Sequence, residues 1–148
     1  MAALGPLVAA GGGRLLEGHD VSPYLVAADV MITDHSSAGF EYLLLDRPLV
    51  RISRPALIEI ANIHPDYVAL LGEAALSVDS LEETLAAVDH ALAFPAEKSA
   101  RRRAVADDLF YKPGTATARS VAALYEAILL EQPAPFASAT EVVCQPSA

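Results

Sequence analysis

Short apolar runs alternate with polar turns along the chain, in an order typical of strands and helices that follow one another. Residues 30–33 are β-forming and read as a strand buried on both faces. Turn and cap residues at 34–37 precede helical spacing to about Leu45. Residues 46–48 end that helix, and residues 49–52 read as the next strand. This order predicts a βαβ unit of a parallel sheet, with a right-handed crossover.

Weaker patterns flank this unit. Ser22 is the predicted N-cap of a helix that ends near Ala28, and Ser80 with Glu83 forms the capping box of a later helix. The fold class is therefore α/β, a Rossmann-like parallel sheet with helices on both faces. The remaining expected elements are strands at 14–18 and 75–78 and helices at 55–62, 65–71, 80–94, 96–109 and 115–130.

Length and composition fit a single domain. The chain has 148 residues, of which 53% are apolar and 20% charged. We expect a flexible segment at 1–13, a partial Rossmann-like nucleotide-binding domain at 14–130 and a disordered tail at 131–148. Only three or four strands are predicted, so the sheet is expected to belong to a larger domain or to be completed by a partner, either a second copy or an N-terminal domain.

Charge and cysteine usage exclude several function classes. The formal net charge of −9 disfavours electrostatic binding to nucleic acid. Cys144 is the single cysteine, so no intramolecular disulfide can form, and a cytoplasmic location is expected. No apolar run reaches the roughly 18 residues of a membrane span. No metal or cofactor is expected either, because the four histidines lie far apart in the sequence.

Candidate chemistry gathers where the first strand of the βαβ unit ends. Ser36 and Ser37 are predicted to lie at a helix N-terminus, where free backbone N–H groups and hydroxyls can bind a phosphate or diphosphate. Glu41 follows one turn later, where a carboxylate can accept hydrogen bonds from a ribose diol. The alternative is that both serines are only helix caps and that Glu41 is an exposed helix acid.

The stretch DVMITDHSSAGFEYLLLDRPLV resembles a motif of the CDP-glycerol glycerophosphotransferases, which polymerise teichoic-acid backbones. The family pattern is D-x-x-I-T-D-x-S-S-x-x-F-[DE]-x-x-x-x-x-[KR]-P. Together with residues 110–119, the region also resembles the UDP-N-acetylglucosamine epimerases more distantly. The residues that stand in their family places are Asp29, Ile32, Thr33, Asp34, Ser36, Ser37, Phe40, Glu41 and Pro48.

The resemblance implies a GT-B fold, with this chain as the later part of the C-terminal, nucleotide-binding domain. Ser36 and Ser37 would then bind the diphosphate of CDP-glycerol, and Glu41 the ribose. Asp34 would order the turn or face the ligand, and residues 114–115 (Gly114 and Thr115) would open the final helix at the donor site. The complete enzymes transfer glycerol phosphate from CDP-glycerol to a polymer hydroxyl. For this chain a cytoplasmic location that extends to the inner face of the membrane is expected, and any membrane association would come from a partner or a missing region.

This chain departs from the family pattern in two ways that bear on its function. His35 replaces the usual tyrosine, and it either points outward or faces the ligand and moves protons. The family's catalytic histidines lie upstream of the matched region, and His64 before Pro65 reads instead as a loop residue at a helix start. The alternatives are therefore a UDP-sugar enzyme or a truncated, non-catalytic nucleotide-binding or assembly module. Residues 101–103, three arginines, read as a solvated helix face.

Overall fold

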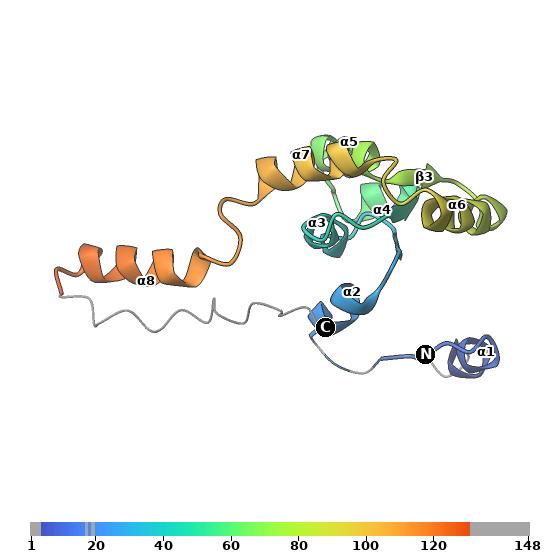
Figure 1. Ribbon diagram of the computed structural model, residues 1–148, viewed down its shortest axis with the longest axis horizontal. Coiled ribbons are helices and arrows are strands. Elements are labelled where there is room, and N and C mark those ends of the chain that lie inside the picture. The colour runs from blue at the N-terminus through green and yellow to red at the C-terminus, as the bar shows by residue number, and fades with distance from the viewer. Residues whose placement is uncertain (1–3, 17, 19, 131–148) are drawn as a thin grey trace, which may run out of the picture. The chain divides into compact units, whose positions relative to one another are not determined.

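The structure, a computed structural model, describes residues 4–16, 18 and 20–130, which form helices and a small sheet (Figure 1). The chain divides into two compact units, Met1–Ala106 and Asp107–Ala148, and each is described by itself. The elements are α1 (Leu4–Ala10), α2 (Ser22–Ala27), β1 (Met31–Thr33), α3 (Ala38–Leu43), β2 (Leu49–Ile52), α4 (Pro55–Ile60), α5 (Pro65–Ala74), β3 (Leu76–Val78), α6 (Leu81–Ala93), α7 (Ser99–Leu109) and α8 (Ala116–Ala127).

The sheet is parallel and has the strand order β1-β2-β3. Met31 is paired with Leu49 and Thr33 with Arg51, so β1 and β2 begin level with each other and β2 extends one residue further, to Ile52. This arrangement confirms the predicted βαβ unit, with α3 as the crossover between two neighbouring parallel strands.

Helices cover both faces of the sheet, as predicted. Side chains alternate between the two faces along a strand, so Val50 and Arg51 point to opposite sides. Val50 and Val78 form a buried cluster with Ala91 of α6 on one face. On the other face α3 packs against β1 and α5. The fold is therefore a partial α/β, Rossmann-like domain.

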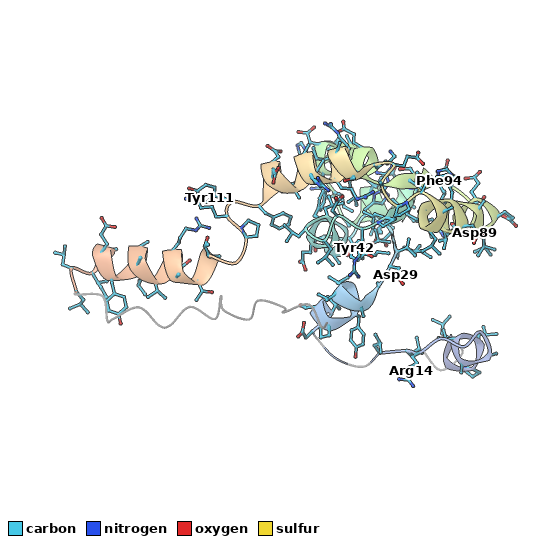
Figure 2. All side chains as sticks on the ribbon, viewed as in Figure 1. Arg14, Asp29, Tyr42, Asp89, Phe94 and Tyr111 are labelled. Carbon is cyan, nitrogen blue, oxygen red and sulfur yellow. The ribbon has the colours of Figure 1, made fainter. Side chains whose placement is uncertain are left out.

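Gly39 allows the close approach of α3. A Cβ atom at this position would lie 3.2 Å from a Leu71 methyl group and 3.3 Å from the Thr33 methyl group. Tyr42 on the same helix is completely buried, and its hydroxyl donates to the carbonyl of Ala28 at 2.9 Å (labelled in Figure 2). The glycine and the tyrosine together fix the position of the crossover helix above the sheet.

The N-terminal part of the chain differs from expectation. Residues 14–16 have no regular structure, so the strand predicted at 14–18 is not observed; a β-strand requires a neighbouring strand for its hydrogen bonds. Ser22 is not an N-cap, because the Asp20 carboxylate accepts a hydrogen bond from the Ser22 N–H at 2.9 Å and Val21 holds the cap position. Helix α1 lies within the segment expected to be flexible, whereas the predicted tail at 131–148 lies outside the described residues.

The capping box at α6 is confirmed with one change. Ser80 Oγ accepts a hydrogen bond from the Glu83 N–H at 3.2 Å. The Glu83 carboxylate accepts from the N–H of Asp79 at 2.9 Å, one residue before the expected donor. The start of α6 is thus fixed by side chains directly after β3.

Asp46 is the centre of a polar cluster between the end of α3 and α7. Its carboxylate accepts hydrogen bonds from Ser99 Oγ at 2.7 Å, Arg102 Nε at 3.0 Å and Arg103 Nε at 2.7 Å. Arg102 is only 3% exposed, so the prediction that the three arginines form a solvated face is wrong for this residue. Arg102 also donates to the carbonyl of Pro95 at 2.7 Å. Through these hydrogen bonds the cluster holds α7 against the turn that precedes β2.

The pKa of Asp46 is lowered in the folded chain. Burial acts in the opposite direction and raises the pKa, but the hydrogen bonds from Ser99 and Arg103 and the charge of Arg102 outweigh it. The ionised carboxylate is therefore the stabilising form, and its contribution is present above the unfolded-state pKa of about 3.9. That contribution is lost as the pH falls through the lowered pKa of the folded state.

We expect Asp46→Asn to lower the free energy of unfolding by about 2 to 3 kcal/mol, because it leaves the buried Arg102 without its counter-charge. Asparagine tolerates the positive φ of 50° at this position, so the backbone conformation is kept. Urea unfolding followed by circular dichroism at pH 7 measures the change. Asp89→Asn, at an exposed site on α6, is the control and should have little effect. Equal losses in the two variants would contradict this assignment.

Candidate functional site

The serine turn, residues 34–37, connects β1 to α3 and is ordered by its own side chains. Asp34 Oδ1 accepts a hydrogen bond from the Ser36 N–H at 2.9 Å. Ser36 Oγ accepts from the Ala38 N–H at 3.4 Å, and the Ser36 carbonyl accepts from the Gly39 N–H at 3.1 Å. The Asp34 carboxylate therefore orders the turn, and its other expected role, facing the ligand, stays a prediction.

The hydrogen bonds within the serine turn differ from the predicted row of free N–H groups. Free N–H groups were predicted at the start of the helix, but those of Ser36, Ala38 and Gly39 already have acceptors within the turn. Ser37 is the N-cap residue and makes no side-chain cap hydrogen bond. Ser36 and Ser37 are both exposed. The serine turn therefore presents hydroxyls to solvent, rather than a row of free amides.

Glu41 lies in the first turn of α3 and is exposed. It follows Ser37 by four residues, which places the two on neighbouring positions of one helix face. The buried residues of the same helix are Gly39, Tyr42 and Leu43, so Glu41 lies outside the packed side. The structure thus brings Asp34, both serines and Glu41 into one continuous segment.

His35 is buried, with 9% of its surface exposed, so the expectation that it points outward is wrong. Its Nε2 accepts a hydrogen bond from the backbone N–H of Arg54 at 3.1 Å, so the neutral ring carries its hydrogen on Nδ1. Nδ1 is also buried and has no partner among the described residues. The contact joins the serine turn to the loop that follows β2. Sequence reasoning missed it because the two residues are 19 positions apart.

The pKa of His35 is lowered. Burial is the main cause, the charge of Arg51 acts in the same direction, and the opposing effect of Asp34 is smaller. The neutral imidazole is thus the form that the fold favours, and this is the form that can accept the Arg54 N–H.

Gly114 and Thr115 belong to the second unit, which is described separately. Gly114 has a φ of 79°, the left-handed conformation that glycine adopts without strain. Thr115 is the N-cap residue of α8, but its hydroxyl donates to the Lys112 carbonyl at 2.6 Å instead of capping the helix. Arg119 lies over the Tyr111 ring, 4.7 Å from its centre (Tyr111 is labelled in Figure 2). These contacts fix the start of α8.

The remaining histidines have structural partners or lie outside the described residues. His64 is the N-cap of α5, and its Nδ1 accepts from the Asp66 N–H at 3.3 Å, which confirms its interpretation as a residue at a helix start. His90 Nε2 contacts the Glu97 carboxylate, a pair that the spacing did not indicate. His19 lies outside the described residues. Within the described ranges, no group of three His, Cys, Asp or Glu residues is placed to hold a metal ion.

The fold and the serine turn together define a Rossmann-like α/β domain with polar groups at the carboxyl ends of its parallel strands, where such folds bind ligands. Residues 14–122 match the family model of the CDP-glycerol:poly(glycerophosphate) glycerophosphotransferases. The chain belongs to this family. No curated protein and no solved structure matches it. Among the helices that the structure describes, none has the length and apolar character needed to cross a membrane.

We expect the free energy of unfolding to fall as the pH drops below about 6.5, because the unfolded chain then binds a proton at His35 more readily than the folded chain does. The slope attributable to one such proton is at most about 1.4 kcal/mol per pH unit. His35→Gln keeps a hydrogen-bond acceptor but does not titrate, so it should flatten this part of the pH profile.

Urea unfolding between pH 5 and pH 8, a range that brackets the ordinary pKa of histidine of about 6.5, measures the effect. An unchanged slope in His35→Gln would show that His35 does not titrate differently in the two states.

Proposed function

We propose that the serine turn binds the diphosphate of CDP-glycerol and that Glu41 binds its ribose. The observation that carries this proposal is the exposure of Ser36, Ser37 and Glu41 on adjacent positions of one turn, in a chain of the glycerophosphotransferase family. Hydroxyls donate hydrogen bonds to phosphate oxygens, and a carboxylate accepts them from a ribose diol. The serines of the turn precede Glu41 of α3 in the chain, as the diphosphate precedes the ribose in the proposed binding mode.

The reaction that this donor serves is a phosphoryl transfer. An acceptor hydroxyl attacks the phosphorus next to glycerol, a new P–O bond forms, the bond to the bridging oxygen breaks and CMP leaves with that oxygen. A base takes the proton of the hydroxyl. The chain's residues hold the diphosphate in this scheme. His35 and His64 each use a ring nitrogen to accept a backbone N–H, so we assign neither of them as the base.

A second candidate function follows because neither His35 nor His64 is assigned as the base. A chain that holds the donor and has no assigned base is suited to act as a non-catalytic nucleotide-binding module. Release of CMP from CDP-glycerol in the presence of acceptor distinguishes the two, since only the enzyme produces it. Tighter binding of UDP than of CDP would instead favour a UDP-sugar enzyme.

We further propose that the sheet continues beyond β1, in an N-terminal domain or a second copy of the chain, and that the protein acts in the cytoplasm. Ile32 shares a face with Val50 but is 50% exposed, whereas Val50 is fully buried. The difference arises because α6 packs against β2 and β3. An apolar side chain on an edge strand is a suitable contact for a further element.

We expect Glu41→Ala and the double variant Ser36→Ala with Ser37→Ala each to weaken CDP binding by about 1 to 3 kcal/mol, because hydrogen bonds to charged groups are lost. Isothermal titration calorimetry with CDP measures the affinity. Glu82→Ala, which removes an exposed acid from the first turn of α6, and Ser77→Ala, at an exposed serine of β3, are matched controls and should bind CDP normally. Unchanged affinity in both site variants would reject the assignment of the site.

A further inference from the structure

We propose that Arg54 binds the phosphate charge of the donor at the serine turn and that His35 is the positioning residue that holds Arg54 there. This inference rests on the proposed function of the serine turn. It adds the one element that the segment from Asp34 to Glu41 lacks, which is a cation. Two hydroxyls and two carboxylates alone are a poor match for a diphosphate in a chain of net charge −9.

The topology places Arg54 beside the serine turn. β1 and β2 are neighbouring parallel strands whose ends differ by only one residue, so the loops after them leave the same edge of the sheet. The N–H of Arg54 donates to His35 Nε2 at 3.1 Å, and His35 directly precedes Ser36. Because this contact is made by the backbone of Arg54, the guanidinium is left free to bind a ligand.

Arg54 also differs from the other lysines and arginines between residues 29 and 106. It is exposed, and its guanidinium makes no hydrogen bond or ion pair with any residue in the described ranges. Every other lysine or arginine between residues 29 and 106 donates to a named acceptor. Those residues are Arg47 (to Val26 and Ala28), Arg51 (to Val68), Lys98 and Arg101 (to Glu73), and Arg102 and Arg103 (to Asp46).

An arginine suits the chemistry of this position. The guanidinium presents several N–H donors in a fixed plane, which matches the paired oxygens of a phosphate group. Negative charge grows on the bridging oxygen as CMP leaves, and a cation already in place stabilises that charge. Burial of His35 keeps its ring neutral and able to accept the Arg54 N–H, so the loop after β2 stays next to the serine turn.

Calorimetry with CDP on the full chain tests the proposal. We expect Arg54→Ala to weaken CDP binding about tenfold or more, as is typical when a hydrogen bond to a charged group is lost. Arg54→Lys should recover part of the affinity. Arg14→Ala is the matched control, because it removes another exposed arginine, far from the serine turn in the sequence, and changes the net charge by the same amount. It should bind CDP like the unmodified chain.

His35 variants test the positioning role. His35→Leu removes the acceptor for the Arg54 N–H and should weaken CDP binding, whereas His35→Gln keeps an acceptor and should restore most of it. The double variant His35→Leu with Arg54→Ala should bind CDP no more weakly than Arg54→Ala alone, because both changes remove the interaction of Arg54 with the phosphate. Additive losses, or a loss in His35→Gln equal to that in His35→Leu, would overturn the positioning role.

The outcomes separate this inference from the proposed function. Normal CDP binding by Arg54→Ala, together with weaker binding by Glu41→Ala, would overturn the role of Arg54 and leave the serine turn as the donor site. Equal weakening in Arg14→Ala and Arg54→Ala would show an effect of net charge and would also overturn it. Absence of CDP binding by the unmodified chain would reject the proposed function, and the inference with it.

Discussion

The parallel pairing of β1 with β2 is the constraint on which the rest of the first unit depends. Because the two strands run parallel and their ends differ by only one residue, the serine turn and the loop that carries Arg54 leave the same edge of the sheet. The crossover helix α3 must return to the start of β2 within a few residues, and Gly39 lets it pack directly on Thr33 of β1. The geometry of the proposed site therefore follows from the strand pairing.

Polar groups are distributed differently at the two ends of these strands. Near the amino ends they are paired: the Ala28 carbonyl accepts from Tyr42 and Arg47, and Asp46 accepts from Arg102. At the carboxyl ends, Ser36, Ser37 and Arg54 are exposed. The paired groups stabilise the fold, while the exposed groups are available for a ligand. This asymmetry is what parallel sheets with a binding function require, since their ligands bind at the carboxyl edge.

The βαβ unit could be predicted from the sequence because its signals are local: two short apolar runs, a cluster of cap residues and a proline before the second strand. The exposed serines and Glu41 followed from the same local pattern. The buried environments of His35 and Arg102 could not be predicted, because their partners Arg54 and Asp46 lie 19 and 56 residues away. The strand predicted at 14–18 is absent for a related reason, since strand formation depends on a neighbour that local patterning does not show.

The environment of His35 also limits which part of the reaction it can serve. A general base needs a free lone pair and a pKa near the working pH. The Nε2 lone pair of His35 accepts the Arg54 N–H, Nδ1 carries the hydrogen, and burial lowers the pKa. Protonation of Nε2 would place a donor against a donor and break the contact with the Arg54 N–H. His35 therefore cannot both accept the Arg54 N–H and receive the proton of an acceptor, so the proposed function requires a base other than His35.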